Sequence, residues 1–390
     1  MIALDRVGRK LWTGLAALMV LALTGCGIGL GPIAGGEAAG PARAEPVRIG
    51  LLVPGAAAGA SPAEQAQNAA ISRDLTNAAN LAATERSGVV LTVHETGGTA
   101  EGTRTAVAAA VAEGAEVLVG PLFADAAAAA GVAAAPGGLN VLSFSNTTSV
   151  AGGNVFVLGD SFEGRAARLL GYAASQGRDD VFAVYGDTVA ERIAFNAIVG
   201  AAPGSGARLA GQQPYPFSAD GIAQAVAGIA AGVRGSQADA LLFTATPTGA
   251  LPLLLQLLPD AGIAQPERQF ISLARLDVGA DTLALPGIEG TWFPIPDPTS
   301  NNGFRARYRA AYGADPHPLA GLAYDGVSIV SGGGPGRGAL TASGGYPGAY
   351  GTVRLLPSGI AQRLLAVAQV QGGQSVLIDP APTRFGGAGL

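Results

Sequence analysis

The residues best placed to bind a ligand are short polar side chains that follow predicted strands. Ser145, Asn146 and Thr147 come directly after a short apolar run. Gly120 is the last residue of the preceding apolar run, and Phe123 follows that run. Hydroxyl groups and exposed backbone N–H groups at such a turn can hold a carboxylate without a full positive charge. The competing interpretation is an ordinary turn rich in Ser, Thr and Asn. We expect these five residues to form one wall of a ligand cleft.

A second set of candidates ends the strands expected in the later half of the chain. Tyr185 and Asp187 end one strand, Thr244 and Thr246 end another, and Arg275 follows a third. Arginine there could meet an anion, and the polar groups could contact a ligand from the opposite side. A tyrosine that packs at the rim and an arginine that is simply solvated are the alternatives left open.

The only cysteine, Cys26, has chemistry of a different kind. It follows a basic segment and an apolar run, Leu11 to Leu23, that is shorter than the roughly 20 residues needed to span a bilayer. Such a run is typical of a signal-peptide core. Leu23-Thr24-Gly25-Cys26 resembles the bacterial lipobox, in which the thiol is acylated and the preceding bond is cleaved. We therefore expect residues 1–25 to be a lipoprotein signal peptide and residues 26–45 to be a lipidated cysteine with a flexible tether.

The rest of the composition argues against most enzymes and against nucleic-acid binding. One cysteine excludes a disulfide within the chain, and the two histidines, His94 and His317, leave too few ligands for a usual zinc site. The only lysine is Lys10, so no P-loop is present. Net charge is −5 without a basic cluster, which disfavours nucleic acid as a partner. No Gly-x-Ser-x-Gly elbow occurs. We expect no catalytic residues, no metal and no cofactor, and predict that the chain is not an enzyme.

Alternating strands and helices must position these residues. The pattern predicts strands at 47–53, 89–93, 117–120, 141–144, 181–185, 207–211, 241–243 and 270–273. Helices are expected between them, and the first begins at a capping box, Ser61 to Glu64, with proline at its first position. This order is typical of parallel sheets with helices on both faces. At 390 residues, two lobes with a cleft between them are expected.

The C-terminal part departs from this alternation. Two helices are expected around 304–312 and 319–330, followed by a glycine-rich loop at 331–349. A β-hairpin is expected from 350–355 and 363–370, with its turn at Pro357-Ser358-Gly359, and a strand at 376–378 follows.

These elements and several short strings resemble type I periplasmic binding proteins of the leucine-binding group, over residues 46 to about 380. Within that group the chain is more similar to the penicillin-binding protein activator lipoproteins. The strings that carry the similarity are Val119-Gly120-Pro121-Leu122-Phe123, Phe144-Ser145-Asn146, Val155-Phe156-Val157-Leu158-Gly159, Trp292-Phe293-Pro294-Ile295-Pro296-Asp297-Pro298, Leu322-Ala323-Tyr324-Asp325 and Ile378-Asp379-Pro380-Ala381-Pro382.

The resemblance implies an α/β, two-lobed type I periplasmic-binding-protein fold, in which each lobe is a parallel sheet flanked by helices. We expect residues 46–158 with about 287–345 to form lobe 1, and residues 159–286 with about 346–385 to form lobe 2. The enteric activator carries a helical-repeat domain ahead of this module, whereas this sequence has only the short tether there.

The resemblance also implies a function. The leading hypothesis is a periplasmic, lipid-anchored module that regulates peptidoglycan synthesis by contacting a peptidoglycan synthase, a penicillin-binding protein. Because Gly27 is not aspartate, the outer membrane is favoured over the inner. The alternative is a solute-binding lipoprotein that delivers an amino acid or related small molecule to an ABC permease.

Overall fold

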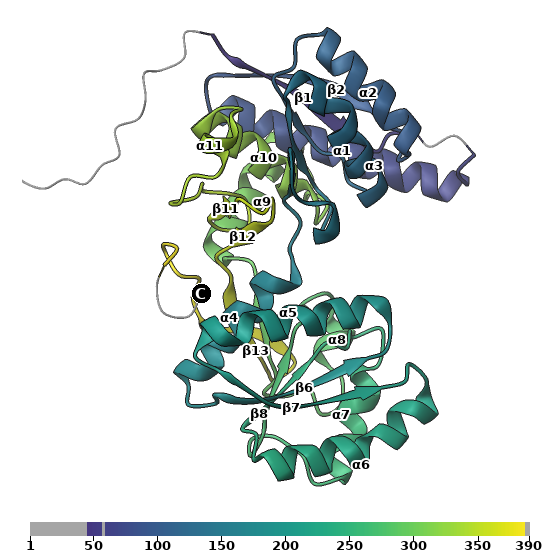
Figure 1. Ribbon diagram of the computed structural model, residues 1–390, viewed down its shortest axis with the longest axis vertical. Helices are drawn as coiled ribbons and strands as arrows, with labels where there is room; N and C mark the ends of the chain where they lie inside the picture. Colours follow the sequence, from purple (N-terminus) through teal and green to yellow (C-terminus); the bar gives the residue numbers. More distant parts are fainter. Residues whose placement is uncertain (1–44, 57–58, 387–390) are drawn as a thin grey trace, which may run out of the picture. The chain divides into compact units, whose positions relative to one another are not determined.

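A computed structural model describes residues 45–56 and 59–386. The expected signal peptide, the lipobox with Cys26 and nearly all of the tether lie outside the described residues. Two sheets organise the described part, each with helices on both of its faces (Figure 1). This arrangement confirms the predicted α/β fold.

The first sheet is entirely parallel, with strand order β2-β1-β3-β4-β5. Helices α1, α9 and α10 contribute to the hydrophobic core on one face, and α2 and α3 contribute to the core on the other. The elements are β1 (Val47–Val53), α1 (Pro62–Glu85), β2 (Val89–Glu95), α2 (Ala100–Ala112), β3 (Val117–Val119), α3 (Ala124–Ala134), β4 (Asn140–Ser143), β5 (Val155–Val157), α9 (Pro298–Tyr312), α10 (Ala320–Gly333) and the short α11 (Arg337–Leu340).

The second sheet is mixed, with strand order β14-β13-β10-β9-β8-β6-β7. Helices α6 and α7 cover one face, and α4 and α5 cover the other. Its elements are α4 (Phe162–Ser175), β6 (Asp180–Gly186), α5 (Val189–Ser205), β7 (Arg208–Tyr215), α6 (Ala219–Ser236), β8 (Ala240–Phe243), α7 (Leu251–Asp260), β9 (Gln269–Ser272), α8 (Ala280–Leu283), β10 (Trp292–Ile295), β13 (Ala366–Gln371) and β14 (Gln374–Asp379). Strands β13 and β14 are antiparallel to their neighbours, which the expectation of a parallel sheet did not include.

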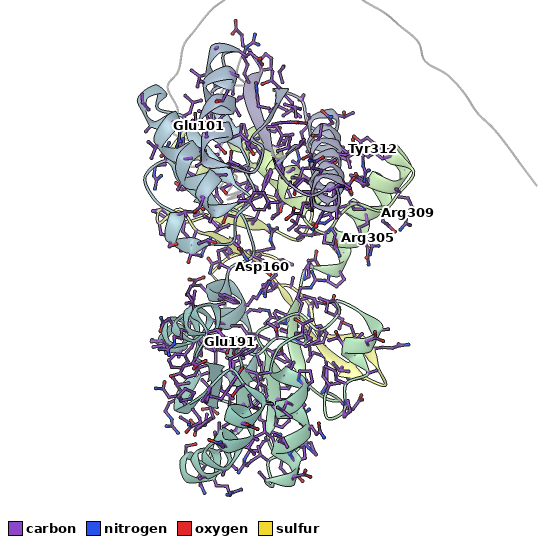
Figure 2. The ribbon with its side chains drawn as sticks, turned by 90° about the vertical axis from the view of Figure 1, so that its right-hand side faces the viewer. Glu101, Asp160, Glu191, Arg305, Arg309 and Tyr312 are labelled. Carbon is purple, nitrogen blue, oxygen red and sulfur yellow. The ribbon has the colours of Figure 1, made fainter. Side chains whose placement is uncertain are left out.

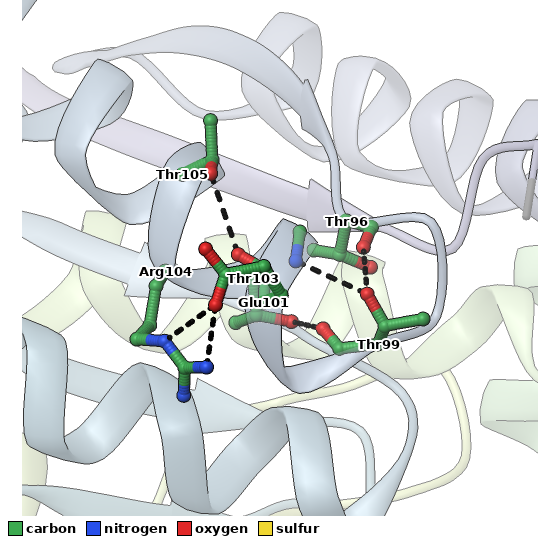
Figure 3. A network of polar contacts seen from close by, with 7 residues as sticks. Thr96, Thr99, Glu101, Thr103, Arg104 and Thr105 are labelled. Carbon is green, nitrogen blue, oxygen red and sulfur yellow. Dashed lines mark hydrogen bonds and ion pairs between the residues drawn. The ribbon is translucent and has the colours of Figure 1, made fainter. Parts of the chain in front are cut away.

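Polar caps set the starts of several helices, among them α1 and α2. The capping box of α1 is present, because the Ser61 hydroxyl accepts from the Glu64 backbone N–H and the Glu64 carboxylate accepts from the Ser61 backbone N–H. Figure 3 shows the start of α2, where the Thr99 hydroxyl oxygen accepts from the Gly102 N–H at 3.1 Å. Such caps satisfy backbone donors that the helix itself leaves free.

The C-terminal hairpin differs from the one expected. The turn at 357–359 joins β11 (Val353–Leu355) to β12 (Ala361–Arg363), two strands of three residues each. The longer strand β13 pairs instead with β10 and β14. Most of β13 is buried, so pairing inside the second sheet satisfies its backbone groups away from water.

The pairing of β10 also bears on the lobe boundaries. The sequence predicts that residues from about 287 belong to lobe 1, whereas β10, at 292–295, pairs in the second sheet. We propose that the chain returns to lobe 1 after β10, and that it enters lobe 2 again after β12, since the Val157–Ile360 bridge ties the β11–β12 turn to the first sheet.

Candidate functional site

A pocket of about 560 Å³ lies at the carboxyl ends of β3 and β4 in the first sheet. It brings together four of the predicted residues, Phe123, Ser145, Asn146 and Thr147. Phe123 is 41% exposed and directly precedes α3. The position agrees with the general rule that ligands of parallel α/β sheets bind beyond the carboxyl ends of the strands.

Hydrogen bonds within the turn use several of its polar groups. The Ser143 hydroxyl donates to the Pro121 carbonyl at 2.8 Å and accepts from the Ser145 N–H at 3.1 Å. The Ser145 hydroxyl in turn accepts from the Thr147 N–H at 3.1 Å, and Ser145 is buried. The Thr147 hydroxyl and the exposed Asn146 side-chain amide have no hydrogen-bond partner among the described residues and can meet a ligand. The turn therefore offers fewer donors than its sequence suggests.

Gly120 shapes this wall through its backbone. Its φ is +93°, a region that favours glycine, and a Cβ atom there would lie 2.2 Å from the Leu52 carbonyl oxygen. Any larger residue would push β3 away from β1. Gly120 thus permits close strand packing beneath the pocket, and it does not line the pocket itself.

In the second sheet, a buried carboxylate lies at the carboxyl ends of the strands, which is where parallel α/β sheets bind ligands. Glu191, on the first turn of α5, is 8% exposed. One of its oxygens accepts from the Gly186 N–H at 2.8 Å, the Tyr215 hydroxyl at 2.6 Å and the Thr244 hydroxyl at 2.7 Å. These donors come from the carboxyl ends of β6, β7 and β8. Strands β7 and β8 lie on opposite sides of β6, so the crevice where the strand order reverses is filled from within the chain.

Tyr215 is held as a donor in this cluster. Burial raises the pKa of Tyr215 above its ordinary value, and the hydrogen bond to Glu191 raises it further. The phenol therefore keeps its proton and donates to the carboxylate.

The remaining candidates of this sheet have separate places. Thr244 is buried and committed to Glu191, while Thr246 is exposed. Tyr185 stacks on Phe195 with ring centroids 4.0 Å apart, which is the packing role considered as its alternative. The exposed Asp187 accepts from the Phe217 N–H at 3.1 Å.

Arg275 lies apart from these four residues. Its guanidinium donates to Asp277 through two hydrogen bonds of 2.9 and 2.8 Å. It lines a pocket of about 220 Å³ together with residues of α9 and of the segment before α10.

Sequence reasoning missed Glu191 and Tyr215. Thr188 and Glu191 form the Thr-x-x-Glu pattern of a helix start, and the Thr188 hydroxyl does accept from the Glu191 N–H at 3.2 Å. The pattern therefore marks the cap but does not reveal that the carboxylate turns toward β6. Only the strand order places Tyr215 and Thr244 within its reach.

Two further findings concern the described residues alone. No group of three or more His, Cys, Asp or Glu side chains in this part of the chain could hold a metal ion. None of its helices combines the length and apolar character needed to cross a bilayer.

The two sheets, the crossings between them and the first-sheet pocket define a binding-protein module of the α/β class. The chain belongs to the periplasmic binding protein family, whose model matches residues 46–374. A search of curated proteins found no match.

Solved structures with the same fold come from different functional settings. A Rhodospirillum rubrum protein, assigned provisionally to a branched-chain amino acid ABC transporter, is 19% identical with a TM-score of 0.69, covering 85% of this chain and 100% of its own. The C-domain of LpoA from Haemophilus influenzae, a regulator of PBP1A, is 19% identical with a TM-score of 0.62, covering 85% and 99%. An ABC transporter substrate-binding protein from Desulfitobacterium hafniense, in complex with Leu, is 18% identical with a TM-score of 0.58, covering 86% and 100%. At these identities the similarity shows the fold alone.

Proposed function

We propose that this protein acts in the periplasm by contacting another protein, a peptidoglycan synthase, and does not capture an amino acid for transport. The observation that carries the proposal is the filled crevice of the second sheet. Gly186, Tyr215 and Thr244 already donate to the Glu191 carboxylate, so these three donors are not free for a second ligand. The fold shared with the LpoA C-domain agrees with a regulatory role. In this proposal the chain is not an enzyme.

A groove on the α4–α5 side supplies a candidate contact surface. A mainly apolar pocket of about 460 Å³ is lined by α4, α5 and the β11–β12 hairpin. Ile193, in its wall, is 45% exposed, and Val189, one turn earlier on α5, is 78% exposed. Exposed apolar side chains next to a groove are typical of protein-binding surfaces. We propose that the synthase docks here.

The test is reconstitution with a purified synthase. The full-length chain in mild detergent should bind a peptidoglycan synthase of its own organism and change the rate of glycan polymerisation. Ile193→Asp should abolish both effects, while Val132→Asp, at an equally apolar but separate site on α3 (76% exposed), should leave them intact. Binding to no synthase, together with recovery of an ABC permease from the same membranes, would replace this proposal with transport.

The alternative function has one observation in its favour. The first-sheet pocket keeps the Thr147 hydroxyl and the Asn146 amide available for a small molecule. A solute-binding lipoprotein for an amino acid or related molecule would use this wall. It would also require a partner for the ligand's ammonium group, and Asp160, the acidic residue among those lining this pocket, is paired with Arg165 at 2.7 Å.

Lipid anchoring through Cys26 is part of the proposal. The lipobox predicts that Cys26→Ser releases the protein from the membrane fraction, because several acyl chains are needed for stable attachment. Sedimentation with membranes in high salt would count against the anchor. We further propose the outer membrane as the location.

A further inference from the structure

The pocket at Arg275 has an unusual lining. Its polar side chains are Arg275, Asn301, Arg305 and His317, and its apolar wall includes Phe304 and Tyr350. No acidic side chain is among the described residues that line its volume of about 220 Å³. The pocket therefore collects hydrogen-bond donors and positive charge around a small space.

Arg275 is fixed in place with part of its donor capacity left over. Asp277 accepts from Nε and Nη2 of Arg275, at 2.9 and 2.8 Å, and this two-point contact holds the plane of the guanidinium. Nη1 has no hydrogen-bond partner among the described residues. The Arg275 side chain is 34% exposed, so Nη1 can meet a ligand without first being stripped of a full water shell.

Arg305 carries a positive charge that is only partly neutralised. Its nearest carboxylate is Asp315 at 3.4 Å, and the same oxygen lies 2.5 Å from Arg309. Figure 2 shows Arg305 and Arg309 one turn apart on the same helix. One carboxylate thus serves two guanidinium groups, and the more distant one, Arg305, lines the pocket.

The two other polar groups are also donors. His317 Nδ1 accepts from the Leu319 N–H at 3.2 Å, so the neutral ring carries its proton on Nε2. The Asn301 amide group has no partner among the described residues. The Tyr350 hydroxyl does not compete as an acceptor, because it donates to the Pro318 carbonyl and accepts from the Gly321 N–H at 3.0 Å.

We propose that this pocket binds the oxyanion group of a small molecule, a carboxylate or a phosphate. Planar guanidinium groups match both oxyanions through paired hydrogen bonds, and the Asn301 amide and His317 Nε2 add single donors. The site shares His317 with the first-sheet pocket, but the turn at Ser145–Thr147 does not line it. The proposal does not depend on the synthase proposal. It would give the protein a means of responding to a soluble anion.

The test is titration of the full-length chain in mild detergent with malonate and, separately, with inorganic phosphate, at constant ionic strength set by sodium chloride. Calorimetry should detect binding of at least one of the two. Phosphate alone or malonate alone would each support the proposal and would identify the chemistry. Absence of heat with both at 10 mM would overturn it.

Variants assign the binding to this pocket. Arg275→Gln and Arg305→Gln should each weaken binding at least tenfold, and Asn301→Asp, which adds a carboxylate to the wall, should abolish it. Arg104→Gln is the matched control, since it removes one positive charge from an exposed pair with Glu101 on α2 (Figure 3). Equal weakening by Arg104→Gln would show that only net charge matters and would overturn the proposal. Arg305 is exposed enough that its variant should fold even if Arg275→Gln does not.

Discussion

Replacement of Glu191 should destabilise the second sheet, and the structure gives the magnitude. Hydrogen bonds to a buried carboxylate contribute about 1.5–3 kcal/mol each, and a buried donor left without a partner costs about 1–3 kcal/mol. Glu191→Ala strips three donors at once, so we expect a loss of about 4 kcal/mol after water enters the space. Glu191→Gln can place its amide oxygen where this one carboxylate oxygen accepts all three hydrogen bonds. It therefore loses only the charge of the acceptor, and should cost about 2 kcal/mol.

Thr244→Val tests whether the cluster acts as a unit. Alone it should cost about 1 kcal/mol, because it removes one donor with little change in shape. Combined with Glu191→Gln it should cost less than the sum of the two, since the hydrogen bond from the Thr244 hydroxyl to a neutral amide oxygen is already weaker than its bond to the carboxylate.

Urea denaturation followed by tryptophan fluorescence is the assay. Trp292 is buried in β10 and therefore reports on the second sheet. Glu101→Gln is the control, because Glu101 is exposed and should change the free energy of unfolding by less than about 0.5 kcal/mol. A Glu191→Gln protein that unfolds at the wild-type urea concentration would refute the assignment of Glu191 as the acceptor that fills the crevice.

Three further predictions follow from the described contacts. Arg363→Met should lower the free energy of unfolding, measured by urea denaturation, by about 3–5 kcal/mol. The reason is that the fully buried Asp325 carboxylate loses the guanidinium that lies 2.7 Å away. Adding Asp325→Asn to this variant should recover part of the loss. Burial raises the pKa of Tyr350 to about 12. The unfolded state, whose tyrosines ionise near 10, therefore binds fewer protons above that pH, and Tyr350 should lower the free energy of unfolding by about 1.4 kcal/mol per pH unit up to about pH 12. Because the pKa values of Tyr215 and Tyr324 are raised as well, Tyr350→Phe should reduce the slope by this amount and leave the remainder. Leucine, isoleucine and valine should bind with Kd above about 1 mM by calorimetry, and micromolar binding weakened by Thr147→Ala would show that the first-sheet wall binds amino acids.

Sequence patterns predicted the parts of the fold that depend on local chemistry. Strand β1 occupies the apolar run expected at 47–53, and α1 begins at its capping box. Burial periodicity and caps lie within a few residues of each other, so a linear reading can find them. Partners distant in the chain could not be found this way. The pairing of β10 with β13 joins residues more than 70 positions apart, and nothing local to either strand names the other.

The candidate site was likewise predictable from the sequence only in part. The cluster of Phe123 with Ser145–Thr147 was predictable because parallel strands bring their carboxyl ends to one edge. The hydrogen bond of Thr244 was not predictable from the sequence. Its acceptor is Glu191 on α5, and only the folded sheet brings that side chain across the end of β6 to Thr244. A strand-end hydroxyl looks the same in sequence whether it is free for a ligand or already bonded.

The distribution of charge around the pockets narrows what a ligand could be. A zwitterionic amino acid needs donors for its carboxylate and an acceptor for its ammonium group, and an ammonium buried without an acceptor is costly. Near the first-sheet pocket the carboxylate of Asp160 is already paired with Arg165. Near Arg275 the lining residues supply donors but no carboxylate. At the ends of β6 and β8 the Glu191 carboxylate is buried under three donors. The exposed Asp187 carboxylate there accepts from the Phe217 N–H through one of its oxygens. Within the two pockets the carboxylate acceptor is thus either paired, as in Asp160, or missing, as near Arg275, and this favours an anion over an amino acid as their ligand. The two proposals together describe a regulator that senses a small anion at the Arg275 pocket and passes the effect to a bound synthase.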